Sequence, residues 1–574
     1  MSPLPPPVPA TQTAPAWLLP AAFIGLLALA AWSLVSTGGE PLLAWRGAEV
    51  WGHAWTWWWH GEALPAWPDG TSLATGAASW PVIDPLPALL GAGISRAAGP
   101  VVAWNAMALA GIAGAFAGGR WLSRRVGGSG AVGGLVLAMG PVFTGSLLSG
   151  LSEDLAIGLL AVAVGLVVKP PALGPSASAT SWRWAIAAGC SLGLLAWCGP
   201  YLAWLGAATA VVAGLTHLIR APRSWSRWLV AGLIAAALAV PPLLAQGARA
   251  ITGAGHRSGV HLGQAEPLWQ LNPWGQADLL SFLTPGAIAL PADAVIRLHP
   301  TYLGLGVLLL ASLAGRSRWW WLLLAALLLA PGEQLHWLGQ AHDLSNPAAL
   351  ALDWLPGGAL LNHHARLFLL GQVALAALAA LGAQRLATRP RWRPRLVLPL
   401  AALLVMVDYG LLAPVPWPLP AAQAQSPDFL GELGPLNPGM LLWLPTGGPG
   451  LSPQRPLLDQ RAHGRPLALN PNRPGAPTWL PRSPLGGWLA ALGRTPGAPP
   501  PADRDVQPLI DHALRVLAVA APLDRAVAAH LGPPTVQGQD GAAWDLNLLA
   551  GELAPATAPQ AGRSGDMLIE EPQP

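Results

Sequence analysis

Cysteine and charge are both scarce in this chain of 574 residues. Only two cysteines occur, Cys190 and Cys198, and both lie in one apolar run, which argues against a disulfide framework or a cysteine-ligated metal site. Charged residues make up 10% of the chain and hydrophobic residues 53%, with a mean hydropathy of +0.45. Soluble domains carry about 25% charged residues. The composition therefore indicates a protein that crosses a membrane many times.

Motifs of soluble enzymes are missing as well. No HExxH, paired CxxC, GxSxG, Walker or GxGxxG motif stands out, so a soluble-type hydrolase, an ATPase or a nucleotide-binding enzyme is not supported. The net charge of +4 includes no basic arm that would indicate a nucleic-acid partner. The first 16 residues carry no positive charge and make a poor signal peptide, so we expect residues 1–16 to form a Pro-rich cytoplasmic leader.

Long apolar runs, by contrast, are abundant. A helix needs about 20 mostly apolar residues to cross a bilayer. Eleven runs reach or approach this length, namely 17–36, 101–119, 129–149, 154–168, 184–199, 201–219, 228–246, 301–315, 319–331, 367–386 and 396–413. The run 81–98 is assigned to a juxtamembrane or re-entrant segment, because counting it as a span would invert every later joint.

The polar joints between these runs alternate in charge. One set contains basic residues and no acid: Arg120, Arg124, Arg125, Lys169, Arg183, Arg220, Arg223, Arg227, Arg316, Arg318, Arg385, Arg389, Arg391, Arg393 and Arg395. The other set contains every acid before residue 400. Because basic joints stay in the cytoplasm during insertion, the acidic joints are expected to face outward, on the extracytoplasmic side of a bacterial inner membrane, with the N-terminus inside.

The expected fold class is an α-helical polytopic membrane protein of about 11 spans with a small extracytoplasmic α/β domain. Residues 17–413 would form the bundle, with long outer loops at 37–100, 247–300 and 331–366. Residues 414–555 lack a spanning run and are broken by Pro and Gly, which indicates the extracytoplasmic domain. The composition of residues 556–574 is typical of disorder.

Two outer joints carry acids that could do chemistry. Glu49 and His53 are four residues apart and would share one face of a Trp-rich helix, which suits a general base or a metal ligand. Solvated loop residues beside interfacial tryptophans are the alternative. Glu153 and Asp154 form an adjacent pair in a very short joint. They are expected either to point into the site or to cap the following helix.

Basic residues are few in the outer joints, where positive charge is disfavoured, so the presence of each one needs an explanation. His256 and Arg257 form one cluster, and His363, His364 and Arg366 form another where a span begins. A phosphate-bearing ligand supplies such a reason, because Arg presents a planar fork to phosphate oxygens. The alternative is that these residues pair with nearby acids such as Asp353.

The acidic joints resemble a known family. Glu49 after the first span and a Trp-rich stretch is followed by Trp80-Pro81, Asp84-Pro85-Leu86-Pro87 and Trp104-Asn105, an order similar to that of the bacterial C-type (GT-C fold) membrane glycosyltransferases, nearest to the YfhO-like multi-span proteins. Further matches are Ser281-Phe282-Leu283-Thr284-Pro285, Tyr302-Leu303-Gly304-Leu305, Ala365-Arg366-Leu367, Leu442-Trp443-Leu444-Pro445 and the stretch from Asp459 to Pro466.

The resemblance implies roles for particular residues. In the family an acid of the first loop, usually Asp, is thought to assist the acceptor hydroxyl, and Glu49 occupies that position. Glu153 or Asp154 matches a second outer acid. A two-acid first-loop motif found in some relatives is absent here, which leaves the need for a divalent metal open.

The implied function is glycosyl transfer from a polyprenyl-phosphate sugar to a glycan, lipid or protein acceptor at the outer face. Glu49 would act as the base, and Arg257, Arg366 and His364 would neutralise the departing lipid phosphate. The alternative is a non-catalytic relative that serves envelope assembly or binds glycan or lipid. A transporter is less favoured, because the spans hold almost no ionisable residue at mid-depth.

Overall fold

The computed structural model describes residues 15–45, 49–62, 84–170, 179–251, 276–286, 300–337, 340–355, 357–358, 361, 363–390, 393–444, 455–468, 479–492, 495 and 497–553. The chain divides into two compact units. The bundle unit comprises residues 1–426, 447–461 and 470–474, and the tail unit comprises residues 427–446, 462–469 and 475–574. The expected leader and disordered end lie almost wholly outside the described residues.

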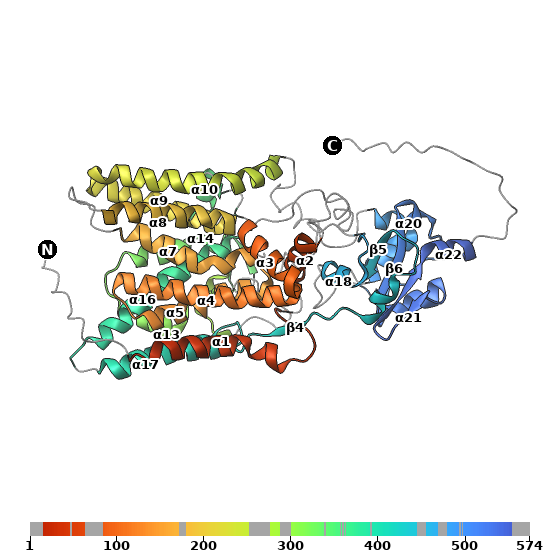
Figure 1. The fold of residues 1–574 in the computed structure, drawn as a ribbon, viewed down its shortest axis with the longest axis horizontal. Helices are drawn as coiled ribbons and strands as arrows, with labels where there is room; N and C mark the ends of the chain where they lie inside the picture. The colour runs from red at the N-terminus through yellow and green to blue at the C-terminus, as the bar shows by residue number, and fades with distance from the viewer. Residues whose placement is uncertain are drawn as a thin grey trace. The chain divides into compact units, whose positions relative to one another are not determined.

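Long helices lying side by side make up most of the bundle unit (Figure 1). They are α1 (Leu18–Ser36), α4 (Pro100–Val126), α5 (Gly130–Ala138), α6 (Pro141–Ser149), α7 (Ile157–Val168), α8 (Ala179–Cys198), α9 (Pro200–Arg220), α10 (Trp225–Ile251), α13 (Leu305–Ser312), α14 (Trp319–Leu329), α16 (Phe368–Ala387) and α17 (Pro394–Val407). Several begin at a proline, whose fixed φ and missing N–H suit the first helical position: Pro100, Pro141, Pro200 and Pro394.

The helical membrane fold expected from the sequence is confirmed. Seven described helical stretches are long and apolar enough to cross a bilayer: 18–36, 100–126, 130–149, 200–220, 225–244, 364–387 and 394–412. The other four expected spans contain α7, α8, α13 and α14, which are shorter or less apolar. The third expected span is broken at Gly140-Pro141 into α5 and α6, because proline cannot donate the backbone hydrogen bond that a continuous helix needs.

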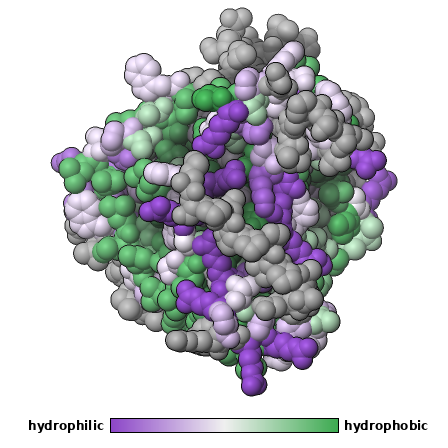
Figure 2. Space-filling view, turned by 90° about the vertical axis from the view of Figure 1, so that its left-hand side faces the viewer, coloured by the Kyte–Doolittle hydropathy of each residue, from purple (hydrophilic) through white to green (hydrophobic). Residues whose placement is uncertain are grey.

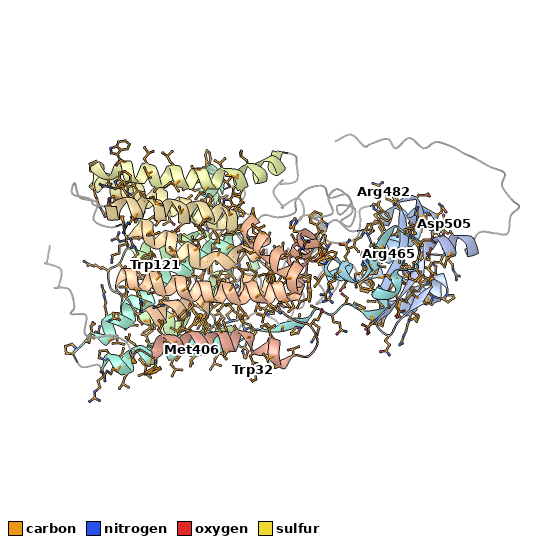
Figure 3. The ribbon with its side chains drawn as sticks, viewed as in Figure 1. Trp32, Trp121, Met406, Arg465, Arg482 and Asp505 are labelled. Carbon is orange, nitrogen blue, oxygen red and sulfur yellow. The ribbon has the colours of Figure 1, made fainter. Side chains whose placement is uncertain are left out.

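Small residues allow the central helices of the bundle to touch. A Cβ atom on Gly118 would lie 2.3 Å from the Gly158 carbonyl oxygen of α7, and one on Gly382 of α16 would lie 1.7 Å from the Leu310 oxygen of α13. Such contacts are typical of helices in membranes, where close backbone approach replaces the hydrophobic driving force. Helix α1 lies at the margin instead, and its Trp32 side chain is exposed (Figure 3).

One end of the bundle, called here the basic end, carries Arg125, Lys169, Arg318 and Arg385. Their side chains bind the carboxyl ends of neighbouring helices. Arg125 Nε donates to the Gly165 oxygen over 3.0 Å, and Arg318 Nη1 donates to the Val168 oxygen over 2.5 Å. Arg385 likewise donates to the oxygen of Ala314. A band of hydrophilic side chains crosses this end between hydrophobic ones (Figure 2).

The opposite end, called the acidic end, carries two further helices, α2 (Val50–Glu62) and α3 (Pro85–Ala98). Helix α3 covers most of the run 81–98 and has 14 residues, fewer than the roughly 20 a span needs. Strand β1 (Pro41–Leu43) pairs with β4 (Ala421–Gln423), and β2 (Gln334–Trp337) pairs with β3 (Gln340–Ser345), both antiparallel.

The tail unit is built on a four-stranded sheet in the order β5-β6-β8-β7. Strand β5 (Met440–Leu444) is parallel to β6 (Leu514–Ala520), which is antiparallel to β8 (Gly541–Asp545), and β7 (Val536–Gln537) pairs with β8. Helices α19 (Pro484–Leu492), α20 (Gln507–Asp511), α21 (Leu523–Leu531) and α22 (Leu546–Leu553) accompany the sheet. Figure 3 labels Arg465, Arg482 and Asp505 of this unit.

The boundary of the tail unit differs from the expected residue 414. The compact unit begins at residue 427, and residues 447–461 group with the bundle instead. These residues include the first part of α18 (Arg455–His463). Strand pairing explains part of the shift, since β4 at 421–423 is bound to β1 beside the first span. Short polar segments have no hydrophobic periodicity, so the sequence could not predict that this part of the chain packs with the bundle.

Candidate active site at the acidic end

The tip between α6 and α7 lies directly against the start of α2. Helix α6 ends at Gly150, whose φ of +98° is the left-handed conformation that glycine adopts most easily. A Cβ at this position would lie 2.2 Å from the backbone nitrogen of Val50. The Glu49 N–H donates to the Ser149 oxygen over 2.8 Å. The backbone of the tip therefore fixes where Glu49 stands.

Arg366 binds both acids of the expected pair. Its Nη1 donates to Glu153 Oε1 over 2.7 Å, and its Nη2 donates to Asp154 Oδ1 over 2.6 Å. The three side chains are at most 3% exposed. The guanidinium carbon also lies 4.1 Å from the centre of the Tyr201 ring. Arg366 thus pairs with acids, the alternative considered from the sequence, and its partners in the structure are Glu153 and Asp154.

Ser152 connects two further site residues. Its hydroxyl donates to Asp84 and lies 2.8 Å from Nδ1 of His53. The tautomer of His53 decides which atom donates in the second contact. Burial lowers the pKa of His53, which keeps the ring neutral.

Glu49 is the accessible acid of the group. Its side chain is exposed, yet surrounding protein replaces much of its hydration. This desolvation, reinforced by the nearby charge of Glu153 and opposed by Arg366, raises the pKa of Glu49 to about 7. Glu153 behaves differently, because the charge of Arg366 outweighs the effect of its burial and lowers its pKa. The surroundings therefore give the two carboxyl groups different roles. Glu49 has a pKa near neutral pH and can act as a base, whereas Glu153 stays ionised.

A donor set for a cation is also present. Ligand atoms of His53, Asp84 and Glu153 all lie within 4.8 Å of one another. Glu153 Oε2 is buried and has no hydrogen-bond partner among the described residues. Burial and the charge of Glu153 raise the pKa of Asp84 well above its usual value. One neutral imidazole and two carboxylates are ligands that Mn²⁺ or Zn²⁺ accepts.

The two histidines of the second cluster lie beside this group. The His363 N–H donates to the Tyr201 hydroxyl over 2.7 Å, and His364 is buried. Burial and the neighbouring Arg366 lower the pKa of His363 to about 4, so its ring is neutral at pH 7. His256 and Arg257 lie outside the described residues, and their expected role stays a prediction.

The structure brings together most of the residues singled out from the sequence: Glu49, His53, Glu153, Asp154, His363, His364 and Arg366. Sequence reasoning did not assign roles to Asp84, Ser152 and Tyr201. Asp84 and Tyr201 each stand next to a proline that begins a helix, at the acidic end. A position next to such a proline could have identified these residues in the sequence, because it places a side chain at the N-terminus of a helix.

Comparison of the sequence with protein families finds no matching family, and comparison with characterised proteins finds no match. Among solved structures, the chain is similar to the arabinofuranosyltransferase AftD from mycobacteria, with 15% identity and a TM-score of 0.47 over 88% of this chain and 37% of AftD. It is also similar to the archaeal oligosaccharyltransferase AglB from Archaeoglobus fulgidus, solved with an inhibitory peptide and a dolichol-phosphate, with 12% identity and a TM-score of 0.43 over 88% of this chain and 69% of AglB.

A third similar structure is that of ArnT from Cupriavidus metallidurans bound to undecaprenyl phosphate, with 13% identity and a TM-score of 0.39 over 94% of this chain and all of ArnT. The TM-scores of all three structures are below 0.5, so their likeness to this chain carries no argument about its activity. Because the identities are 15% or lower, the chemistry of this chain has to be inferred from its own site residues.

Proposed function

We propose that this chain is a membrane glycosyltransferase that moves a sugar from a polyprenyl-phosphate donor to an envelope or protein acceptor. One observation carries the proposal. Glu49 is an accessible acid whose pKa lies near 7, and it stands beside two acids that Arg366 holds in place. A general base works best when its pKa is close to the working pH. The acidic end is proposed to face outward, because the basic joints lie at the other end.

In the proposed reaction the acceptor hydroxyl attacks the anomeric carbon of the donor sugar. Glu49 takes the hydroxyl proton, and the new bond joins the acceptor oxygen to the sugar. The bond from the anomeric carbon to the phosphate oxygen breaks, and its electron pair leaves with the polyprenyl phosphate. Attack from the face opposite the phosphate inverts the anomeric configuration. No nucleotide is needed on the outer side.

The role proposed here for Arg366 differs from the phosphate contact that the resemblance implies. Both of its terminal nitrogens bind carboxylates, so the residue holds Glu153 and Asp154 rather than offering its whole fork to a phosphate. Held in this way, Glu153 can orient the acceptor. Neutralisation of the leaving phosphate is then proposed for His364 and, outside the described residues, for His256 and Arg257.

A divalent cation fits the same site. The carboxyl groups of Glu49, Asp84, Glu153 and Asp154 all lie near the guanidinium of Arg366, and Oε2 of Glu153 has no hydrogen-bond partner among the described residues. His53, Asp84 and Glu153 would hold the ion. When bound, it would neutralise charge that develops on the leaving phosphate.

The test is transfer of radiolabelled sugar from a panel of polyprenyl-phosphate donors into a cell-envelope fraction. Glu49→Gln should reduce transfer by about two to four orders of magnitude, the usual contribution of a general base. Glu62→Gln is the matched control, since Glu62 is an exposed acid at the end of the same helix. Unchanged transfer by Glu49→Gln would refute the proposal. Absence of transfer by the unmodified protein with every donor would favour the non-catalytic scaffold.

A further inference from the structure

Helix α2, which follows Glu49, has two different faces. His53 and Trp57 are four residues apart and point to one side. Trp57 lies 5.3 Å from Trp104 of α4 between ring centres, and His53 reaches Ser152. This face belongs to the proposed site.

The opposite face of α2 carries Trp51 and Trp55, also four residues apart and both buried. Residues of α18, about 400 positions later in the chain, cover them. The Trp55 indole N–H donates to Gln460 Oε1 over 2.7 Å. The guanidinium of Arg455 lies 4.4 Å from the centre of the Trp51 ring. Helix α2 is therefore held between α4 on the site face and α18 on the other.

Helix α18 is itself bound to rigid parts of the bundle unit. Arg455 donates through Nη1 to the Gln423 oxygen over 2.7 Å and through Nη2 to the Gln425 oxygen over 2.6 Å. Its Nε contacts Asp459 at 3.1 Å, and Asp459 accepts from the Ser426 hydroxyl over 2.9 Å. The β4 region that receives these bonds is paired with β1, the strand that precedes Glu49 in the sequence.

We infer that Arg455 and Gln460 are positioning residues for the site, and that α18 keeps α2 at the distance at which His53 and Glu49 face Glu153. Part of this inference rests on the proposed function, because only a transferase would show it as a change in rate. The expected change in the stability of α2 does not rest on the proposed function. Loss of the α18 contacts should let α2 loosen whether or not the chain is an enzyme, since the buried Trp55 N–H would lose its acceptor.

Amide hydrogen exchange of α2, measured on the full-length protein in detergent or nanodiscs, tests this inference. Gln460→Leu removes the acceptor and should make amides of residues 50–62 exchange about tenfold faster, the effect of losing one buried hydrogen bond. Gln460→Glu keeps an acceptor oxygen and should restore slow exchange. Gln507→Leu is the control, because Gln507 is an exposed residue of the tail unit. Unchanged exchange in Gln460→Leu overturns the inference.

The two proposals can fail separately. Faster exchange of α2 in Gln460→Leu, with no transfer by the unmodified protein, would support the positioning role and refute the transferase. Transfer by the unmodified protein that falls in Gln460→Leu through kcat, and recovers in Gln460→Glu, supports both. Transfer that depends on Glu49 but not on Gln460 overturns the inference alone.

Discussion

Glu49 shows how one residue acquires chemistry from its surroundings. An exposed Glu in a loop has a pKa near 4.3 and is a weak base at neutral pH. Here protein atoms and the charge of Glu153 raise the pKa of Glu49 to about 7, while Arg366 limits the rise. Arg366 therefore does two things. It holds Glu153 in place, and its positive charge limits the rise in the pKa of Glu49.

The rate of transfer should depend on pH through Glu49. A base must be deprotonated, so we expect kcat/KM to be low below the pKa and to rise through pH 7 to a plateau, following a group with a pKa of about 7. Glu49→Asp should retain part of the rate and the rising limb, and Glu49→Gln should lose both. A flat profile from pH 5 to 9 would show that Glu49 is not the base.

Removal of Arg366 should cost stability as well as activity. Arg366→Met leaves two buried carboxyl groups, Glu153 and Asp154, without their partner. The expected loss is about 3–5 kcal/mol of unfolding free energy, measured by denaturant titration in micelles. The comparison variant is Arg389→Met in an exposed joint, which should change stability by less than about 0.5 kcal/mol. Restoring most of the stability by adding Glu153→Gln and Asp154→Asn would confirm the electrostatic cause.

The cation site can be tested by binding alone. Titration of the purified protein with Mn²⁺, followed by electron paramagnetic resonance, should reveal one site that His53→Ala and Asp84→Asn remove. At 100 times the dissociation constant, the ion should stabilise the folded protein by about 2.7 kcal/mol, which chelation reverses. His217→Ala near the basic end is the control. Binding that survives His53→Ala would place the ion elsewhere.

At the scale of elements, the site depends on a close approach of two backbones. The α6 tip and the start of α2 meet where only glycine fits, at Gly150. Elsewhere in the bundle a second glycine, Gly127, ends α4 with a φ of +88° and has open space around it. Both glycines have a positive φ, but only Gly150 lies close to the backbone of another segment.

This pair gives a matched prediction. Gly127→Ala should lower stability by about 1–2 kcal/mol through the positive φ alone and leave transfer intact. Gly150→Ala carries the same strain and adds a clash with the backbone of Val50, for a further loss of about 1–3 kcal/mol. It should also reduce transfer, because Glu49 moves with Val50. Equal behaviour of the two variants would show that the tip does not position Glu49.

At the scale of the whole molecule, the charges at the two ends of the bundle define a direction across the membrane. The basic end binds helix carboxyl termini through Arg125, Arg318 and Arg385, and the acidic end holds the site. Basic residues are therefore partners for backbone carbonyls that lipid cannot hydrate, and we propose that they are also the orientation signals.

The direction can be measured by cysteine labelling. Both native cysteines lie in α8, so Cys190→Ser and Cys198→Ser give a clean background. In intact spheroplasts a membrane-impermeant maleimide should label Glu62→Cys at the acidic end and should reach Arg389→Cys only after lysis. The reverse pattern would place the site in the cytoplasm and refute an outward-facing transferase.

Composition determined the class of this protein, because a bilayer requires long apolar helices, and the alternating charge of the joints predicted its orientation. They also pointed to Glu49, Glu153, Asp154 and Arg366 as residues that need a reason to lie where they do. These signals are local, since each can be read within one joint and the runs that flank it.

Only the tertiary structure decided which of these residues meet. Arg366 lies 213 positions from Glu153, and Gln460 lies 405 positions from Trp55, so no periodicity in the chain could pair them. The near-neutral pKa of Glu49 likewise arises from neighbours contributed by other elements. Charge and apolarity act along the sequence, whereas burial and contact exist only after distant segments have packed together.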